Sequence, residues 1–332
     1  MSKKVKVGFV GVGGIASVHL RSIEANEDAD IVAVCDISEE NVQRSASTYN
    51  AQAYVDSKQM LENEVLDALF ICVPPFAHGT MEEDASAKGI HLMVEKPVSL
   101  DVATALRKSE AIRESGIIHA TGYCLRYLDT VALVKKYLKN KDIAMISGHY
   151  MTRFVQTPWY RDKSKSGGQL VEQATHTLDL MRYFGGEITD IYANMDLLLM
   201  NDIPDISIPD VTSVQMKFSS GSIGQMACSF TQPDHRAGIE ILGKEFRVVI
   251  DGADASIIEE GKSVRYTSKV NFYEAQDRCF IDAVKTEDQS KILSDYNNGV
   301  ETLLASLAAN HSSDTAKPIQ IDAYRAIESK IL

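Results

Sequence analysis

The first third of the chain alternates between short apolar runs and longer amphipathic stretches. Apolar runs, each read as a strand, occupy residues 5–10, 31–35, 66–73, 91–94 and 117–121. The stretches between them that are typical of helices are 16–25, 39–49, 81–88 and 102–115. Apolar strands that alternate with helices indicate a parallel sheet covered on both faces. We therefore predict an α/β domain with a doubly wound sheet over residues 1–122.

The pattern changes after residue 122. Helix-like stretches at 128–138 and 169–184 flank a strand-like stretch at 143–152, and helices return at 273–285 and 297–310. Between 188 and about 266 the chain is mostly strands separated by turn signals such as Ser219-Ser220-Gly221-Ser222. No flexible linker is visible. This pattern predicts an α+β domain over residues 123–332 with a large, mostly antiparallel open sheet, its last helix able to pack back on the first domain.

Composition narrows the function classes. A length of 332 residues allows two domains, and the net charge of −12 argues against nucleic acid or an anionic membrane as a partner. No apolar stretch has the length of a signal peptide or a membrane span. The five cysteines are far apart and form no CxxC, which indicates reduced thiols and no zinc site. We expect a cytoplasmic protein without a bound metal.

A glycine-rich loop follows the first strand. Residues 8–16 read GFVGVGGIA, and Gly11, Gly13 and Ala16 fit G-x-G-x-x-A between a strand and a helix. The second strand ends in Asp36, 36 − 16 = 20 residues after Ala16, where a carboxylate would accept hydrogen bonds from the adenosine ribose. This arrangement predicts a Rossmann-type dinucleotide site. The loop residues expected to contact the cofactor are Gly11, Gly13, Gly14, Ile15 and Ala16.

The residues after Asp36 favour NAD over NADP. They read ISEENVQ, with two glutamates and no arginine, and would repel a 2′-phosphate. Arg44, a turn or more into the next helix, keeps NADP as the less favoured alternative.

Two further strand ends should lie at the same edge of the sheet. The third strand runs into CVPPFAHG, where Val73, Pro74 and Pro75 would form a stiff wall for the cofactor. His78 either faces the cofactor or caps the next helix. The fourth strand ends in LMVEKP, which directs Lys96 into the same crevice, where its ammonium can hold an oxygen that becomes negative.

Together these motifs resemble the Gfo/Idh/MocA family of NAD(P)-dependent oxidoreductases, and inositol 2-dehydrogenases within it. The ordered set is the GxGxxA loop, V-P-P-x-x-H, E-K-P and GGQLVEQATHTLD at 167–179, similar to the family's G-G-x-x-x-[D/E]-x-x-x-H-x-x-D, and it covers nearly the whole chain. The resemblance implies that Lys96 and His176 are catalytic, that Glu95 contacts the nicotinamide ribose and that the Lys96-Pro97 peptide is often cis. In GYCLRY at 122–127, Arg126 matches a cofactor-binding segment, whereas Cys124 stands where asparagine is common.

The spacing within 167–179 supports a pocket without the resemblance. Glu172, His176 and Asp179 follow i, i+4 and i+3 steps, so on one helix they share a face. The alternative is a solvated face or a histidine with an ion-pair neighbour. The family commonly has aspartate at the position of Glu172, and no third ligand for a metal is evident.

These observations predict hydride transfer between NAD(H) and a secondary alcohol, or the matching ketone, of a sugar, cyclitol or related polyol. His176 would act as general base and Lys96 would stabilise the alkoxide, with the choice of proton acceptor left open. The alternative function is a catalytically silent NAD-dependent sugar sensor or regulator. An apolar outer face on the second sheet would make the protein a homodimer or homotetramer. The predicted substrate contacts are Lys96, Tyr123, Arg153, Trp159, Glu172, His176 and Asp179.

Overall fold

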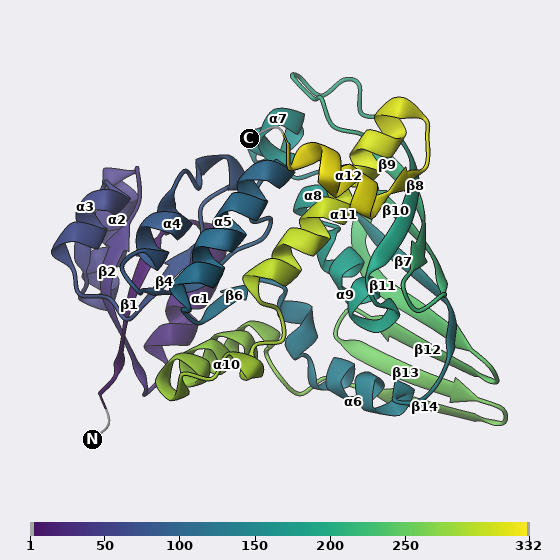
Figure 1. Cartoon of the computed structure of the whole chain (residues 1–332), viewed down its shortest axis with the longest axis horizontal. Coiled ribbons are helices and arrows are strands. Elements are labelled where there is room, and N and C mark those ends of the chain that lie inside the picture. Colours follow the sequence, from purple (N-terminus) through teal and green to yellow (C-terminus); the bar gives the residue numbers. More distant parts are fainter. Residues whose placement is uncertain (1–2, 331–332) are drawn as a thin grey trace. The chain divides into compact units, whose positions relative to one another are not determined.

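The computed structural model describes residues 3–330 and consists of two compact units (Figure 1). The first unit contains residues up to 99, together with 104–124 and 271–299. The second contains residues 100–103 and 125–270 and the chain from 300 onward. The sequence pattern assigned all residues after 122 to the second domain, whereas segment 271–299 returns to the first unit.

The first unit is built on a six-stranded parallel sheet with the strand order β3-β2-β1-β4-β5-β6. This is the doubly wound order, so the chain reverses direction across the sheet between β1 and β4. The predicted fold class is confirmed for this unit. The strands are β1 (Val5–Val10), β2 (Ala29–Cys35), β3 (Gln52–Tyr54), β4 (Ala68–Ile71), β5 (His91–Val94) and β6 (His119–Thr121).

Helices flank this sheet, and the side chains of Ser38, Asp56 and Asn271 cap the N-termini of three of them. Ser38 caps α2 by accepting a hydrogen bond from the amide of Asn41, and Asp56 caps α3 through the amides of Lys58 and Gln59. The short β3 and α3 were not predicted from the sequence. The helices are α1 (Gly14–Glu24), α2 (Glu39–Tyr49), α3 (Ser57–Asn63), α4 (Met81–Ser86), α5 (Val102–Ser115) and α10 (Phe272–Thr286), with a 3₁₀ turn η1 (Pro75–Ala77).

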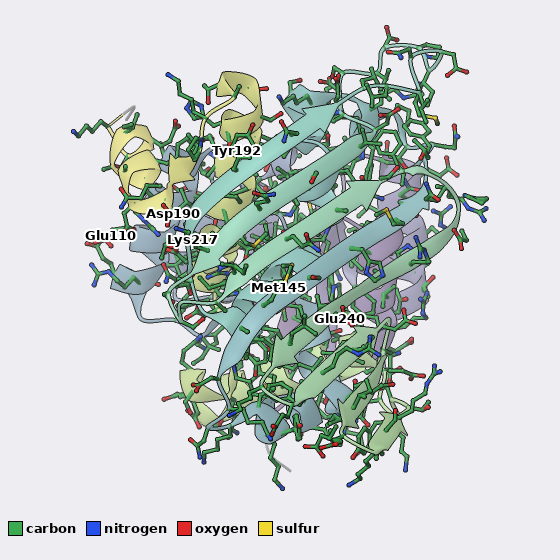
Figure 2. All side chains as sticks on the ribbon, turned by 90° about the vertical axis from the view of Figure 1, so that its right-hand side faces the viewer. Glu110, Met145, Asp190, Tyr192, Lys217 and Glu240 are labelled. Atoms are coloured by element: carbon green, nitrogen blue, oxygen red, sulfur yellow. The ribbon has the colours of Figure 1, made fainter. Side chains whose placement is uncertain are left out.

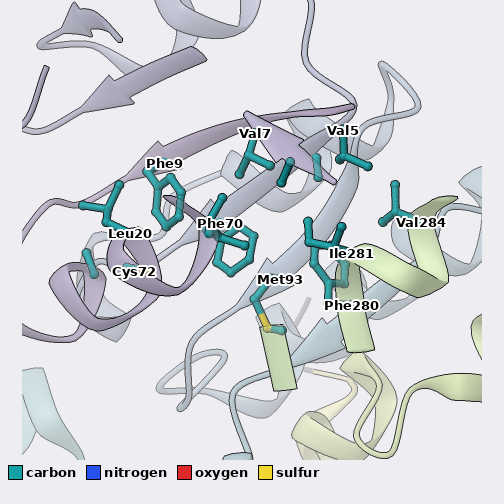
Figure 3. Packing of buried hydrophobic residues seen from close by; sticks show 14 of the residues in the cluster. Val5, Val7, Phe9, Leu20, Phe70, Cys72, Met93, Phe280, Ile281 and Val284 are labelled. Carbon is teal, nitrogen blue, oxygen red and sulfur yellow. The ribbon is translucent and has the colours of Figure 1, made fainter. Parts of the chain in front are cut away.

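The core of the first unit explains why the chain returns to it. Phe9 of β1 stacks on Phe70 of β4, with ring centroids 4.7 Å apart (Figure 3). Phe280, Ile281 and Val284 form one stripe on α10 and belong to the same buried cluster. α10 also packs along α1. The apolar face of α10 is therefore buried in the first unit, although its sequence lies beyond the strands of the second.

The second unit is built on a nine-stranded sheet with the order β14-β13-β12-β11-β7-β10-β9-β8-β15. The β7–β10 pair is parallel and the other neighbours are antiparallel, which confirms the prediction of a mostly antiparallel sheet. The strands are β7 (Ile143–Arg153), β8 (Ile188–Asp196), β9 (Val211–Phe218), β10 (Ile223–Ser229), β11 (Thr231–Gly243), β12 (Phe246–Asp251), β13 (Asp254–Glu259), β14 (Lys262–Tyr266) and β15 (Ile319–Gln320).

One face of this sheet is covered and the other is open. In β9 the side chains alternate strictly, with Val214 and Met216 buried and Gln215 and Lys217 exposed. Figure 2 shows the open face, where Met145, Asp190, Tyr192, Lys217 and Glu240 point outward. This face mixes polar and apolar side chains, in contrast to the apolar face expected from the sequence.

The covered face carries the helices of the second unit, among which α6, α9 and α12 pack on the strands. The prediction of a continuous helix at 169–184 was wrong, because two separate helices form there. The amide of Ala174 bonds to the carbonyl of Gln169, five residues back, and this ends the α-helical ladder. The helices are α6 (Asp129–Leu138), α7 (Lys163–Ser166), α8 (Gln169–Glu172), α9 (Thr175–Gly185), α11 (Tyr296–Thr315) and α12 (Ile321–Glu328). None of the helices in residues 3–330 combines the length and the apolar character needed to span a membrane.

Candidate active site

The glycine-rich loop turns between β1 and α1 against the end of β4. Gly11 has φ +86°, and a Cβ there would lie 2.8 Å from the carbonyl carbon and oxygen of Cys72. Gly13 and Gly14 have no neighbouring atom within 4 Å of an added Cβ, so the outer side of the loop is open. The N-cap of α1 is Gly13, and among residues 3–330 no side chain bonds to the first amide groups of this helix. Its amide groups can therefore receive a phosphate.

Asp36 lies across this loop at the end of β2. Its Oδ2 accepts a hydrogen bond from the amide of Val12 at 2.9 Å, and its Oδ1 accepts one from the amide of Ser38 at 2.9 Å. Burial, with the nearby carboxylates of Asp36 and Asp56, raises the pKa of the Cys35 thiol to about 12. Two carboxylates thus lie at one end of the loop, where they favour ribose hydroxyls over a second phosphate.

A cavity of about 480 Å³ opens beside the loop and Asp36. Three exposed apolar side chains border it, namely Ile37, Val55 and Phe76, which are 97%, 54% and 47% exposed. Apolar walls with a few polar groups are typical of sites for a planar base. Sequence reasoning missed these residues, although an isoleucine directly after Asp36 was a visible signal. The cavity is lined by Val10, Gly11, Gly13, Cys35, Asp36, Ile37, Val55, Asp56, Ser57, Lys58, Cys72, Val73, Pro74, Phe76, Ala77 and Met81.

The predicted wall after β4 lies on this cavity. Val73 and Pro74 line it, and Pro75 begins the turn η1. His78 is buried, and its Nδ1 lies 2.7 Å from Oε1 of Glu82 on α4. Lys108 in turn donates to the other oxygen of Glu82 at 2.8 Å. The structure thus shows His78 bonded to the following helix, while a contact with the cofactor stays a prediction.

The E-K-P segment leaves β5 at the same carboxyl edge. Glu95 is buried, and its Oε2 accepts a hydrogen bond from the backbone amide of Lys96 at 3.1 Å. Its Oε1 lies 3.0 Å from Nε2 of His19 on α1. The Lys96-Pro97 peptide is cis, as the resemblance implies. Because β1, β4 and β5 are parallel neighbours, Lys96 lies at the same edge as the dinucleotide loop.

Tyr123 and Cys124 follow β6 and are both buried in the first unit. Burial, followed by the carboxylate of Glu95, raises the pKa of the Cys124 thiol, and the thiol lies in hydrogen-bonding contact with Tyr273. A buried thiol against a phenol thus replaces the asparagine that is common in the family. The predicted role of Tyr123 in substrate binding stays a prediction.

In the second unit, Glu172 is the last residue of α8 and is buried. Its Oε1 accepts a hydrogen bond from the hydroxyl of Tyr160 at 3.1 Å, and the rings of Tyr160 and Trp159 lie 4.2 Å apart. His176 lies half-buried in the first turn of α9. Glu172 and His176 are therefore on different helices, and the shared helix face predicted from their spacing was wrong.

Asp179 and Arg126 form a buried ion pair within the second unit. Nε of Arg126 donates to Oδ2 of Asp179 at 2.7 Å, and Nη2 donates to Oδ1 at 2.9 Å. The hydroxyl of Thr302 donates to the same carboxylate, and the guanidinium lies over the ring of Tyr183. Arg153 is exposed and donates to the backbone carbonyl of Pro233. These contacts give all three predicted site residues protein partners, and their roles toward ligands stay predictions.

Gln169 is a candidate that sequence reasoning missed. It begins α8, directly after Gly167 and Gly168, which both have positive φ. Its amide oxygen and nitrogen are buried, and neither has a hydrogen-bond partner among residues 3–330. A buried amide without partners is costly, so this side chain is a candidate for a ligand contact. Within the same range, no three His, Cys, Asp or Glu side chains gather as a metal site would require.

Comparisons with known proteins agree with this geometry. Residues 5–123 match the model of the "oxidoreductase family, NAD-binding Rossmann fold", and residues 141–258 match that of the "GFO/IDH/MocA C-terminal domain". The chain is 23% identical to myo-inositol 2-dehydrogenase of Thermotoga maritima over 96% of this chain and 99% of that protein. It is 24% identical to scyllo-inositol 2-dehydrogenase (NAD(+)) of Bacillus subtilis over 98% and 99%.

Solved structures share the fold over nearly the whole chain. Levoglucosan dehydrogenase in complex with NADH and levoglucosan superposes with a TM-score of 0.87 at 16% identity, covering 96% of this chain and 100% of that one. The WlbA dehydrogenase from Bordetella pertussis, in complex with NADH and UDP-GlcNAcA, gives a TM-score of 0.83 at 21% identity, covering 96% and 99%. At these identities the likeness shows the fold.

Proposed function

Because the chain belongs to the Gfo/Idh/MocA oxidoreductase family, with its NAD-binding Rossmann domain, we propose that it transfers a hydride between NAD(H) and a secondary alcohol of a sugar, cyclitol or related polyol. The reverse reaction reduces the matching ketone. One observation carries the proposal, namely that Lys96 follows β5 at the carboxyl edge that also holds the dinucleotide loop. A cation placed there is suited to an oxygen beside the nicotinamide.

The residues of the first unit fit a dinucleotide. The open loop at Gly13 and Gly14 and the uncapped start of α1 suit the pyrophosphate, and Asp36 suits the adenosine ribose. When bound, the nicotinamide supplies the hydride acceptor or donor, and the chain supplies binding, orientation and proton transfer. The proposal keeps NAD as the cofactor, with NADP less favoured because Asp36 and Asp56 both lie near the ribose position.

Lys96 and His176 carry the chemistry in this proposal. The ammonium of Lys96 would donate a hydrogen bond to the reacting oxygen and stabilise its negative charge. The imidazole of His176 would exchange the hydroxyl proton, since its ordinary pKa is close to neutral pH. Lys96 belongs to the first unit and His176 to the second.

A cluster in the second unit supports a polyhydroxylated substrate. Trp159 and Tyr160 lie ring against ring, and Tyr160 bonds to the buried carboxylate of Glu172. Aromatic faces with a carboxylate are groups that can bind the apolar face and the hydroxyls of a sugar or cyclitol ring. The names of the inositol dehydrogenases and of the levoglucosan complex point to the same substrate class. Tyr123, Arg153 and Asp179 complete the proposed set of substrate contacts.

The proposal is tested with a panel of cyclitols, aldoses, sugar acids and anhydrosugars, each with NAD and with NADP, followed by nicotinamide absorbance. We expect turnover of at least one class, faster with NAD. Tight NADH binding without turnover of any compound, in either direction, would favour the sensor or regulator instead. Lys96 and His176 are both present in the chain, which favours the enzyme.

We further propose a homodimer or homotetramer through the open face of the second sheet. This face presents Tyr192 and Met145 beside Asp190, Lys217 and Glu240 (Figure 2). Such a mixture suits an interface with charge complementarity at its edges. Sedimentation at micromolar concentration tests this, and a monomer would contradict it.

The proposed compartment is the cytoplasm. All five cysteines are free, and four of them are buried. Free thiols persist in a reducing compartment.

A further inference from the structure

His19, Asp277 and Glu95 form a buried acid–histidine–acid chain that we call the His19 chain. We propose that Asp277, acting through His19, positions the Glu95 carboxylate beside Lys96, so that His19 and Asp277 are positioning residues for the reaction. This inference rests on the proposed function, because Glu95 and Lys96 form the cofactor end of the proposed site.

The His19 chain joins three elements of the first unit. His19 lies on α1 and is fully buried, as is Asp277 on α10. Nδ1 of His19 lies 2.8 Å and 3.0 Å from the two carboxylate oxygens of Asp277. Nε2 lies 3.0 Å from Oε1 of Glu95, directly after β5. One imidazole therefore links the helix after the dinucleotide loop, the returning α10 and the strand that presents Lys96.

The contacts determine the charge of His19. Both ring nitrogens face carboxylates, and an ionised carboxylate can only accept hydrogen bonds, so both nitrogens must donate. Only the imidazolium has two N–H groups. Burial alone would lower the pKa of His19, but the carboxylates of Asp277 and Glu95 raise it to about 10. The His19 chain thus consists of a cation between two anions and has a net charge of one negative unit.

Glu95 has no freedom to turn away from this position. Its Oε1 is held by His19, and its Oε2 accepts from the amide of Lys96. Behind the carboxyl group lies Gly122, where an added Cβ would lie 2.7 Å from Cδ of Glu95. A carboxylate fixed in this way fixes the backbone of Lys96 and keeps a negative charge at the cofactor end of the site.

The other groups around the His19 chain cannot replace the charge of His19. Tyr273 on α10 meets the imidazole edge to face at 5.9 Å, and burial raises the pKa of its phenol. Burial and the nearby carboxylates also raise the pKa of the thiols of Cys72 and Cys124. These groups are neutral at ordinary pH. A further charged neighbour is Lys96, which lies near Tyr273 and Cys124.

The role of the His19 chain goes beyond stabilising the fold. Buried ion pairs are often no more stabilising than apolar side chains of the same volume. Their distinctive property is that they hold one arrangement of charge and hydrogen bonds. Here that arrangement ends on the residue whose oxygen binds the amide of Lys96, which is a position where small displacements matter for rate.

Asp277→Asn tests the inference because it keeps the shape and removes one anion. Without that anion the pKa of His19 should fall toward its ordinary value, so His19 should lose its proton within the assay range. The ratio of variant to wild-type turnover should then be near one at about pH 6 and fall on the order of 10- to 100-fold by about pH 9. Taking the ratio removes the effects of pH that both proteins share. A ratio that is constant over this range would overturn the inference.

Two comparisons separate positioning from loss of stability. His19→Gln should lower turnover at every pH without a new pH-dependent step, since glutamine does not titrate. Glu301→Gln makes the same carboxylate-to-amide change in the second unit, where Glu301 pairs with Arg325. This control should lower the unfolding midpoint without changing the pH profile. A pH-dependent loss in the control equal to that of Asp277→Asn would overturn the inference.

NADH binding distinguishes this inference from the proposed function. If no polyol is turned over, the proposed function fails, whereas the affinity of Asp277→Asn for NADH should still weaken as the pH rises. An unchanged affinity ratio would overturn the inference whatever the turnover. If Asp277→Asn does not fold, imidazole NMR of the wild type gives the answer. His19 must stay doubly protonated from about pH 6 to about pH 9, and titration within that range would contradict the proposed charge.

Discussion

The carboxyl group of Glu95 fills the space that a side chain on Gly122 would need. An added Cβ would lie 2.7 Å from Cδ and 2.8 Å from Oε2 of Glu95, both closer than van der Waals contact. Neither group can move away. Glu95 is held by His19 on its other side, and the amide of Gly122, directly after β6, donates a hydrogen bond to the carbonyl of Val94. The end of one strand thus shapes the end of its neighbour.

Gly122→Ala should therefore displace Glu95 and lower NADH affinity and turnover, each by roughly tenfold or more. Gly116→Ala is the matched control, since Gly116 has φ +67° with no atom within 4 Å of an added Cβ. The control should lose about 1–2 kcal/mol of stability through its left-handed backbone and keep its activity. NADH titration and chemical unfolding of both variants check this. Unchanged NADH affinity in Gly122→Ala would count against the role of Glu95.

Asp36→Ala should weaken NAD binding and reduce the preference of the protein for NAD over NADP. The substitution removes the carboxylate proposed to face the ribose, and with it the hydrogen bond to the amide of Val12 in the glycine-rich loop. We expect KM for NAD to rise by about tenfold or more, since a bond to a charged group contributes about 1.5–3 kcal/mol. Asp30→Ala is the control, because Asp30 lies on the same strand but pairs with Lys4 at the surface. An equal rise in KM in the control would refute the assignment.

Lys96→Ala and His176→Ala should each lower turnover by about 10²–10⁴-fold, the usual contribution of a positioned acid–base group. NADH binding should persist in His176→Ala, because His176 belongs to the second unit. Lys88→Ala and His235→Ala, which change exposed residues of the same types, serve as controls. Near-normal turnover in both Lys96→Ala and His176→Ala would exclude the proposed roles, whatever the controls do.

The sequence predicted elements best where one periodicity held without interruption. The bounds of β1, α2, β5 and α5 match the predicted ranges, because their apolar positions repeat cleanly and turn or capping residues flank them. The prediction of one continuous helix at 169–184 was wrong at Gln173 and Ala174, where the helix is interrupted. Neither residue breaks helices, so the break depends on hydrogen bonding and on packing with distant residues. α3 is seven residues long, too short for its periodicity to be recognised.

In the candidate site, too, local features could be predicted from the sequence and contacts between distant residues could not. Motifs could predict Lys96, the glycine-rich loop and Asp36 as site candidates because the backbone requirements there are local. Pairs that join distant segments were not predicted. Asp179 was assigned to the substrate from its helix face, yet its carboxylate bonds to Arg126, 53 positions away. His19 and Asp277 are 258 positions apart, and neither lies in the motifs used to predict the site. Such pairs require the positions of two elements in space, which periodicity does not contain.

Asp179→Asn separates a structural role for this residue from a role in substrate binding. Removing one partner of a buried ion pair leaves Arg126 without its counter-charge and should cost about 3–5 kcal/mol in the free energy of unfolding. Asp314→Asn is the control, because Asp314 is exposed, its partner Lys163 is partly exposed, and the change should cost at most about 1 kcal/mol. Urea unfolding measures both. If Asp179 also binds substrate, its variant should raise KM well above the value for an equally destabilised protein.

The stability of the protein should fall in the alkaline range because of His19. The folded-state pKa of His19 is raised to about 10 from an ordinary value of 6.5. Below pH 6.5 His19 carries its proton in both the folded and the unfolded state, so the contribution of the ion pairs is fully present. Between about pH 6.5 and pH 10 only the folded state keeps this proton. The free energy of unfolding should then fall by up to about 1.4 kcal/mol per pH unit from this group.

His19→Gln should be less stable than the wild type near neutral pH, and the difference should shrink as the pH rises toward 10. Other groups that titrate in this window, including the remaining histidines and the lysines, affect both proteins alike and cancel in the comparison. Urea midpoints measured at several pH values check the prediction. A difference that stays constant from about pH 6.5 to about pH 10 would mean that His19 does not gain a proton on folding.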